Sequence, residues 1–390
     1  MQRTTYMDYN ATAPLKPAAL RAMSAALQEA GNPSSVHAYG RQARRIVDQA
    51  RQDVAALVGA RIEDVIFTSG GTEANNLALA SRGDRRLIVS AIEHDSILKR
   101  ARIEGAELIR AQRNGEIDLD HLRHLLRKDD RPAFVSLMLA NNETGVIQPV
   151  VEAGRLAHEH GALFHCDAVQ GAGKIGFDLK TVGADMLTLS AHKLGGPQGV
   201  GALVLNGDRP VMAVMLGGGQ ERFRRAGTEN VAAIAGFGAV AAQGIDAGET
   251  EAIGVLRDAL EDRLAALGQP ITVFGRNAPR LSNTSCFACG ARTSETLVMA
   301  LDLSGIAVSA GSACSSGKVR PSHVISAMGF DAATSGSAIR VSLGWASTMA
   351  DVDAFAAAWS QIRRREASPG DGGPMAAREA ASTGTVQPAA

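Results

Sequence analysis

Short apolar segments bounded by turn residues alternate with amphipathic segments through the first half of the chain. The apolar segments are residues 65–71, 87–91, 134–140, 163–168, 186–193 and 201–206. They are apolar on both alternating faces, which is typical of strands buried inside a parallel or mixed sheet. The amphipathic segment 150–160 ends at Gly161 as a C-cap and is typical of a covering helix. The pattern predicts an α/β fold in which helices cover a mostly parallel central sheet.

The pattern changes after an Ala- and Gly-rich helix near 231–244. A charged helical segment, 249–267, is followed by shorter strands and helices to about residue 365, which predicts a second, smaller α+β domain. The last residues are small and polar and cannot bury enough apolar surface to fold. The predicted parts are an N-terminal segment 1–14, a large cofactor-binding α/β domain 15–245, a small C-terminal α+β domain 246–366 and a disordered tail 367–390.

Charge and composition narrow the classes of partner. The 390 residues include 40 Lys+Arg and 40 Asp+Glu, so no overall charge attracts the protein to nucleic acid or to an anionic membrane. The first residues contain no apolar run of the kind found in a signal peptide or a membrane span. We therefore expect a cytoplasmic protein that acts on a small molecule.

Four cysteines, Cys166, Cys286, Cys289 and Cys314, are too few for a disulfide scaffold in a chain of this length. Cys286 and Cys289 form a CxxC pair, but no second ligand pair follows it. A zinc site would lack half of its ligands, so we do not expect a metal or redox role there.

Two polar residues follow apolar strands in positions that suit a cofactor. Lys193 stands at the end of one strand, directly before glycines, where an amine can project into a cleft and form a Schiff base. A surface lysine would fit the same pattern. Asp167 ends an earlier strand, one crossover away, and its carboxylate could keep a pyridine nitrogen protonated. Asp167 could instead cap the helix that follows.

The segment TSGGTEANN, residues 68–76, predicts a phosphate-binding turn. A strand breaks at Gly70 and Gly71, and a helix opens with Thr72. Free backbone N–H groups and the positive end of the helix dipole attract phosphate, and the glycines let the ligand approach the backbone. Neither GxxxxGK[ST] nor GxGxxG accompanies the turn, which argues against ATP or a dinucleotide.

Taken in order, these segments resemble the NifS/IscS-like cysteine desulfurases, which are fold-type I pyridoxal-phosphate enzymes of the class V aminotransferase family. The resemblance covers nearly the whole chain. The matching blocks are YMDYNATAP near the start, GNPSSVHAYG (31–40), FTSGGTEANN (67–76), EHDSI (93–97), ANNETGVIQP (140–149), HCDAVQGAGK (165–174), SAHKLGGPQGVG (190–201), RRAGTEN (224–230), SAGSACSSG (309–317) and AIRVSLG (338–344).

The resemblance implies pyridoxal 5′-phosphate as the cofactor. Lys193 would hold it covalently and move protons, Asp167 would pair with its pyridine nitrogen, and Gln170 would hydrogen-bond its ring hydroxyl. The phosphate would be bound by Thr72, Ser190, His192 and the backbone of Gly71. Thr228 would reach the phosphate in the neighbouring subunit of a homodimer, so two-fold association would complete the site.

The resemblance also implies a site for L-cysteine. Asn142 and Arg340 would hold the substrate, with the planar guanidinium of Arg340 on its carboxylate, and Asn142 would also contact the cofactor. His94 would stack on the cofactor ring and assist proton transfer. Simpler roles remain open for two of these residues: His94 could begin a helix, and Arg340, in an alternating strand pattern, could face solvent.

Cys314 separates a desulfurase from the other enzymes of this fold. It lies among small residues between Gly311 and Gly317, which predicts a mobile loop, and the nearby Lys318 and Arg320 favour the thiolate. The resemblance implies that Cys314 accepts sulfur from L-cysteine as a persulfide and leaves alanine. The persulfide would pass to an iron–sulfur scaffold protein or a sulfur carrier, and Cys314 could transiently share in binding a cluster.

Other functions remain compatible with parts of the pattern. An aminotransferase or lyase of this fold would use Cys314 incidentally, and a selenocysteine lyase would differ only in the chalcogen of its substrate. A non-catalytic scaffold would be expected to lack Lys193, Asp167 or Cys314, and all three are present. The segment 282–297 departs from the family pattern because it carries two cysteines, and the sequence does not distinguish nitrogenase-specific from housekeeping sulfur supply.

Overall fold

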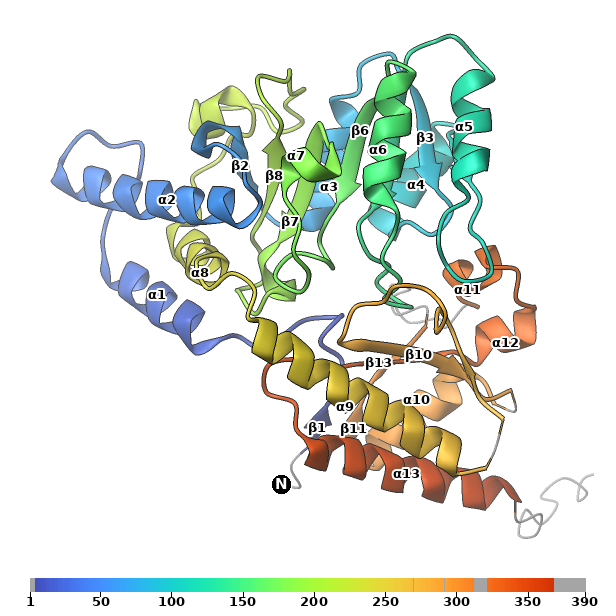
Figure 1. The fold of residues 1–390 in the computed structure, drawn as a ribbon. Coiled ribbons are helices and arrows are strands. Elements are labelled where there is room, and N and C mark those ends of the chain that lie inside the picture. Colours follow the sequence, from blue (N-terminus) through green and yellow to red (C-terminus); the bar gives the residue numbers. More distant parts are fainter. Residues whose placement is uncertain (1–3, 269, 291, 312–320, 368–390) are drawn as a thin grey trace, which may run out of the picture.

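The computed structural model describes residues 4–268, 270–290, 292–311 and 321–367. Within them, a seven-stranded mixed sheet forms the centre of the larger lobe (Figure 1). In sheet order its strands are β2 (Val65–Thr68), β8 (Gly201–Leu205), β7 (Met186–Ser190), β6 (Leu163–Asp167), β5 (Ala133–Met138), β3 (Arg86–Ser90) and β4 (Glu107–Ile109). The strands from β7 to β4 pair in parallel, and β8 pairs in the antiparallel direction with both β2 and β7. The predicted mostly parallel sheet is confirmed.

Helices cover both faces of this sheet, which explains why its strands are apolar on both faces. Val135 and Leu187 point into one core cluster, whereas Phe134 and Met186 point into another on the opposite face. The first face is covered by α2 (Ala38–Leu57), α5 (Leu119–Arg127), α6 (Val150–Glu159), the short α7 (Leu179–Val182) and α8 (Val231–Ala241), and the second by α3 (Gly71–Ala80) and α4 (Asp95–Ile103). Helix α1 (Pro17–Gln28) packs against α8.

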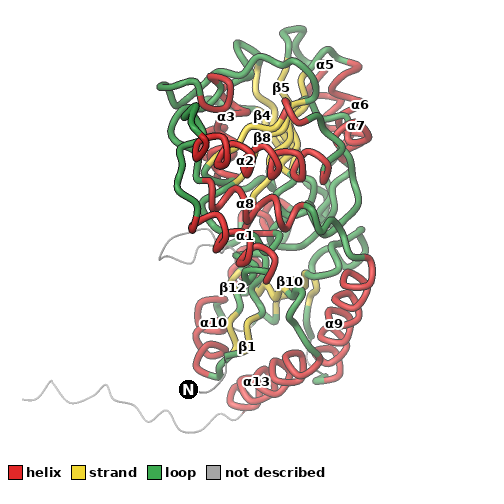
Figure 2. The backbone as a smooth tube through the Cα atoms, turned by 90° about the vertical axis from the view of Figure 1, so that its left-hand side faces the viewer, coloured by secondary structure: helices red, strands yellow, loops and turns green. Residues whose placement is uncertain are grey.

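A smaller lobe lies beside the larger one, as the second view shows (Figure 2). Its four-stranded antiparallel sheet has the order β12 (Ser309–Ala310), β13 (Ile339–Ser342), β10 (Thr284–Ala288) and β9 (Thr272–Val273). Its helices are α9 (Ala247–Ala266), α10 (Ser294–Leu303), α11 (His323–Ala327), α12 (Ala332–Gly336) and α13 (Met349–Ala367). Edge-on contacts of Phe287 with Phe355 and Trp359 lie in its core.

The N-terminal segment joins the two lobes. Strand β1 (Thr5–Tyr6) pairs in parallel with β11 (Ile306–Ala307) of the smaller lobe, and the chain then runs to α1 of the larger lobe. The larger core cluster also takes in Phe274 and Cys286 from the second half of the chain, so the lobes share packed surface. The predicted domain boundaries stay a prediction.

Several element ends differ from the sequence pattern. Strand β7 stops at Ser190, and Lys193 lies in the 3₁₀ turn η2 (Ala191–Lys193). Helix α6 is capped by His160, and Gly161 follows it with φ +66°, the left-handed conformation that glycine adopts without strain. Helix α13 includes Ala367, the first residue of the predicted tail. The rest of the tail and Cys314 lie outside the described residues.

Two 3₁₀ turns in the larger lobe, η1 (Ile62–Asp64) and η3 (Gln220–Phe223), complete the described elements. In that same part of the chain, none of the helices combines the length and the apolar character needed to cross a bilayer.

Candidate functional site

A pocket of about 330 Å³ lies where β6 and β7 end. The carboxyl ends of parallel strands meet at one edge of a sheet, which is where ligands bind in open α/β folds. The pocket is lined by Asn10, Ala11, Gly71, Thr72, Asn75, His94, Ser96, Met138, Ala140, Asn142, Asp167, Val169, Gln170, Ser190, His192, Lys193 and Arg340. The structure therefore brings together every predicted site residue except Thr228, which does not line this pocket, and Cys314, which is not described.

The Lys193 amine lies inside the pocket and not at the outer surface. Its Nζ donates hydrogen bonds to the backbone oxygens of Asn10, at 2.5 Å, and Ala11, at 2.8 Å. Strand β7 and the turn η2 thus place Lys193 next to the segment that joins the two lobes. This placement favours a lysine of the pocket over a lysine of the outer surface.

Asp167 ends β6 with a nearly buried side chain. Its Oδ2 accepts a 2.7 Å hydrogen bond from Nδ2 of Asn75, and its Oδ1 accepts one of 3.0 Å from the backbone N–H of Val169. The second bond is a local contact of the capping kind that the sequence left open. The pairing of Asp167 with a pyridine nitrogen stays a prediction. Burial raises the pKa of Asp167, and a ligand cation beside the carboxylate would favour its charged form.

Glu93 adds a second carboxyl group near Asp167. It is fully buried, and its Oε1 accepts a 2.8 Å hydrogen bond from the backbone N–H of Met138, whose register partner is Asp167. Burial and the charge of Asp167 raise the pKa of Glu93 well above its usual range. Burial therefore favours the protonated form of the Glu93 carboxyl group beside Asp167.

His94 both caps a helix and lines the pocket. It is the N-cap of α4, where its Nδ1 accepts a 3.1 Å hydrogen bond from the backbone N–H of Ser96, and it also lines the pocket. Burial lowers its pKa, which favours the neutral imidazole. The prediction that His94 begins a helix is confirmed. The same side chain can still contact a ligand in the pocket.

The turn between β2 and α3 lines the same pocket. Helix α3 begins at Gly71, and a Cβ there would lie 2.9 Å from Cγ2 of Val169, so glycine is required by the close packing. Ser190 and His192 face the same pocket. Burial lowers the pKa of His192 to about 4, which leaves a neutral ring. A helix N-terminus with a hydroxyl and an imidazole suits a phosphate.

Arg340 enters from β13 of the smaller lobe and is 1% exposed. Its Nη1 donates to the backbone oxygen of Asn142 at 2.9 Å, and its Nη2 donates to Oδ1 of Asp8 at 2.7 Å. Its Nε is buried and, among the described residues, has no hydrogen-bond partner. The alternative that Arg340 faces solvent is wrong, and the guanidinium retains a donor for an anionic ligand.

Thr228 lies in a separate segment, residues 217–228, and is exposed. This segment turns through η3, where Glu221, Arg222 and Phe223 have φ of 44°, 56° and 63°. Residues other than glycine rarely adopt this left-handed backbone conformation, so contacts with the surrounding chain must hold it.

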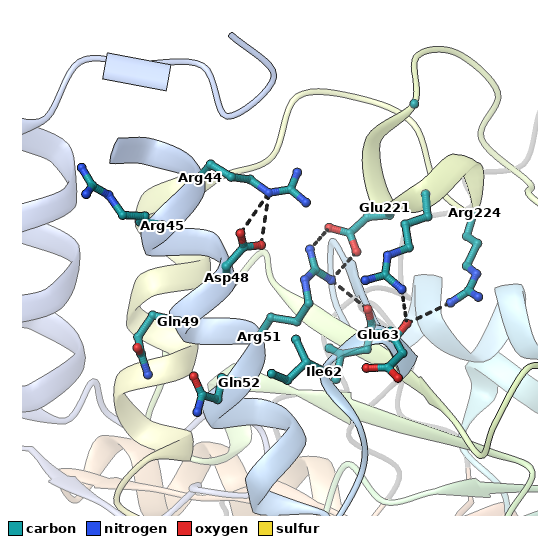
Figure 3. Close-up of a pocket in the computed structure, with 13 residues that line it drawn as sticks. Arg44, Arg45, Asp48, Gln49, Arg51, Gln52, Ile62, Glu63, Glu221 and Arg224 are labelled. Carbon is teal, nitrogen blue, oxygen red and sulfur yellow. Dashed lines mark hydrogen bonds and ion pairs between the residues drawn. The ribbon is translucent and has the colours of Figure 1, made fainter. Parts of the chain in front are cut away.

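The contacts that hold η3 lie beside a larger pocket of about 600 Å³ (Figure 3). Arg51 of α2 donates to both carboxylate oxygens of Glu221, at 2.6 and 2.8 Å, and the backbone N–H of Phe67 donates to the same carboxylate at 3.1 Å. Arg222 and Arg224 both donate to the backbone oxygen of Glu63. The buried ion pair of Arg51 with Glu221 and the two hydrogen bonds to Glu63 anchor the segment that carries Thr228.

Sequence reasoning missed three residues that organise the site. Asn75 binds Asp167, Asp8 pairs with Arg340, and Asn10 accepts the Lys193 amine. Each lies inside a block that carried the family resemblance, so the signal was present, but nothing in the spacing indicated which partner each would find. Their partners come from distant parts of the chain.

Both cysteines of the CxxC pair are buried in apolar cores. Cys286 packs in the larger core cluster and Cys289 in that of the smaller lobe. Among the described residues, no group of His, Cys, Asp and Glu side chains is arranged to hold a metal ion.

The sequence as a whole matches a known family. The model of the aminotransferase class-V family matches residues 5–355. The chain belongs to the class V aminotransferase family. A protein of Cereibacter sphaeroides named cysteine desulfurase is 44% identical to this class V chain over 359 residues, which cover 89% of the chain and 92% of the relative.

Further relatives and a solved structure agree with this placement in class V. An IscS-like cysteine desulfurase of Mycobacterium tuberculosis is 40% identical over 90% of the chain and 93% of its own length. The crystal structure of a NifS-like protein from Rickettsia africae superposes with a TM-score of 0.88 at 34% identity, covering 93% of this chain and all of that one. The resemblance noted in the sequence is confirmed, and the family depends on pyridoxal phosphate.

The residues present fit that cofactor. The pocket offers a reactive amine at Lys193, a buried carboxylate at Asp167 and a helix N-terminus at Gly71. A pyridine nitrogen that is protonated would supply the positive charge that the buried Asp167 carboxylate needs, and a phosphate would accept hydrogen bonds from the start of α3.

Proposed function

We propose that this protein is a cysteine desulfurase that removes sulfur from L-cysteine and leaves L-alanine. The observation that carries the proposal is the meeting of Lys193, Asp167 and Arg340 around one pocket of about 330 Å³. Their chemistry suits a pyridoxal-phosphate enzyme that binds an amino acid by its carboxylate. Relatives at 40–44% identity over most of the chain are named cysteine desulfurases, which supports the choice of substrate.

Each end of the pocket would hold one part of the cofactor. Lys193 Nζ would bond to the aldehyde carbon, Asp167 would face the ring nitrogen, and Gln170 would face the ring hydroxyl. Thr72, Ser190, His192 and the Gly71 backbone would hold the phosphate, and His94 would lie against the ring. When bound, the cofactor supplies an electron sink that makes the α-proton of an amino acid removable.

Residues of this chain would then position the substrate and move its protons. Arg340, with its buried Nε still available, would grip the substrate carboxylate next to Asn142. Lys193 Nζ would take the α-proton, and the neutral His94 imidazole could give or accept a proton beside it. Asp8 would keep the guanidinium in place through the 2.7 Å ion pair.

Cys314 would accept the sulfur. Its thiolate would attack the substrate sulfur, so that an S–S bond forms while the C–S bond breaks. The electron pair of the broken bond stays with the three-carbon fragment, which takes up protons and leaves as alanine. The enzyme is left with a persulfide on Cys314.

The persulfide would pass to an iron–sulfur scaffold protein or another sulfur carrier, with Cys314 able to bind a cluster transiently during delivery. We also infer a cytoplasmic homodimer. The exposure of Thr228, away from the pocket of its own chain, supports the homodimer because it leaves this residue available to a second subunit.

The test uses purified protein loaded with pyridoxal phosphate and supplied with L-cysteine and a reductant, while sulfide and alanine are both measured. The proposal expects equal release of the two products and no release by a Lys193→Ala variant. Alanine that forms only with an added keto acid would point to an aminotransferase. Turnover of selenocysteine without turnover of L-cysteine would point to a selenocysteine lyase.

A further inference from the structure

Lys174 is a second lysine at the proposed cofactor site, and neither the mechanism above nor the sequence reasoning gives it a role. It follows β6 in the turn that carries Gln170, four residues earlier, so both side chains can reach the same side of that turn. Its Nζ donates to Oε1 of Gln170 at 2.9 Å and to Oδ1 of Asn10 at 3.3 Å. Gln170 and Asn10 line the pocket, and Lys174 lies behind them.

The contact with Lys174 fixes the direction of the Gln170 carboxamide. In its protonated form the Lys174 amine only donates hydrogen bonds, so its partner is the oxygen of the carboxamide and not the NH₂ group. The Nε2 of Gln170 is thereby turned away from Lys174 and donates to the backbone oxygen of Asn10 at 3.0 Å. The second N–H of that group remains to donate to the oxygen of a ligand, which is what a cofactor ring hydroxyl requires.

Asn10 holds both lysines. Its backbone oxygen accepts from Lys193, and its side-chain Oδ1 accepts from Lys174 and from Nδ2 of Asn283 at 2.9 Å. The two amines thus share one small residue that is 1% exposed. Two positive charges at such short range inside a protein repel each other strongly enough to change how readily each holds its proton.

The groups facing Lys174 are mostly cationic. Lys193 of η2 and Arg340 of β13 are the charges that act on it, and His192 next to Lys193 feels its charge in turn. Asp8 is already paired with Arg340, and in the described part of the chain no carboxylate pairs with Lys174. Burial, followed by the charges of Lys193 and Arg340, lowers the pKa of Lys174 to about 7.

We propose that Lys174 is a positioning residue of this site, which orients the Gln170 carboxamide toward the cofactor and places a second positive charge beside Lys193. The inference rests on the proposed function, because it assigns Lys174 a role toward the cofactor on Lys193. A neighbouring cation disfavours protonation of the Lys193 nitrogen, which is a known way to keep an active-site lysine nucleophilic near neutral pH.

The test follows the visible absorbance of the protein loaded with pyridoxal phosphate as pH is varied, because the absorbance reports the proton on Lys193 Nζ. Lys174→Met removes the charge and should raise the pH midpoint by about one unit, a tenfold change in proton affinity. Lys174→Arg keeps a permanent charge and should not raise the midpoint. Lys180→Met, at an exposed position of α7, is the matched control and should titrate like the wild type.

An unchanged midpoint in loaded Lys174→Met would overturn the inference. If that variant does not fold, Lys174→Gln removes the same charge while keeping a hydrogen-bond donor, and its midpoint decides in the same way. A wild-type protein that does not take up pyridoxal phosphate would instead contradict the proposed function, so the two failures are distinguishable.

Discussion

The carboxamide of Asn75, in α3, donates a 2.7 Å hydrogen bond to Oδ2 of Asp167 at the end of β6. Asn75 also donates to Oγ of Ser96 at 2.9 Å, and it is 1% exposed. Helix α3, whose first turn is proposed to bind phosphate, and the carboxylate proposed to face the ring nitrogen are therefore held together by one buried side chain. Both ends of the proposed cofactor site depend on it.

Asn75→Ala should keep the fold but slow the reaction. Losing this donor raises the pKa of Asp167 further, so the carboxylate becomes less able to keep a ring nitrogen protonated. A hydrogen bond to a charged group contributes roughly 1.5–3 kcal/mol, which corresponds to a fall in kcat of about 10- to 100-fold. Steady-state kinetics of alanine release measures it, with Asn76→Ala as the control in the same helix. A kcat equal to that of the control would refute this role.

Arg340→Met should raise the KM for L-cysteine while the protein still takes up the cofactor. Truncating one partner of a buried charge pair costs roughly 2–5 kcal/mol, so a rise in KM of about 100-fold is expected. Arg280→Met is a matched control, because Arg280 forms a buried ion pair with Glu261 outside the pocket. It should lower stability without changing KM. Equal KM values for the two variants would show that Arg340 does not bind the substrate.

Arg51→Met should destabilise the larger lobe and loosen the segment that carries Thr228. Arg51 and Glu221 have side chains 9% and 3% exposed, and removing one partner of such a pair costs roughly 3–5 kcal/mol. The midpoint of urea unfolding measures the loss, and Arg51→Met with Glu221→Gln should recover part of it. Arg44→Met removes an exposed pair with Asp48 and should change stability by less than about 1 kcal/mol. Equal effects of Arg51→Met and Arg44→Met would contradict the anchoring role.

Glu143 should make stability depend on pH. Burial raises its pKa from 4.5 to about 7, while its Oε2 accepts a 2.5 Å hydrogen bond from Oγ of Ser322. A carboxyl group whose pKa is raised on folding gives stability that is fully present below pH 4.5 and is lost as pH rises through 7. Glu143→Gln does not titrate, so the wild type should lose stability relative to this variant between pH 5 and pH 8. Urea midpoints of both proteins across that range measure the difference, and parallel curves would contradict the assignment.

The sequence predicted the sheet and much of the pocket because their signals are local. The strands that end at Asp167 and before Lys193 are apolar on both faces, and the turn at Gly71 breaks a strand and opens a helix within a few residues. Each of these features follows from short-range pattern and chain geometry. The family resemblance then supplied the roles that the pattern left open.

The rest of the site depends on partners that only the folded chain brings together. Arg340 can be buried because Asp8, at the other end of the chain, neutralises it. The alternating strand pattern around Arg340 carries no sign of that pairing. The left-handed backbone at Glu221 could not be predicted either. The side chain that holds it, Arg51, comes from α2, and no glycine marks the position in the sequence.

Transfer of sulfur from L-cysteine to Cys314 can be followed in a single turnover. The protein loaded with pyridoxal phosphate is mixed with L-cysteine, without reductant or acceptor, and the peptides and alanine are measured by mass spectrometry. We expect one alanine per site and one added sulfur on the Cys314 peptide, and no added sulfur in Cys314→Ala. Alanine formed in equal amount by Cys314→Ala, or sulfur found on another cysteine, would contradict it.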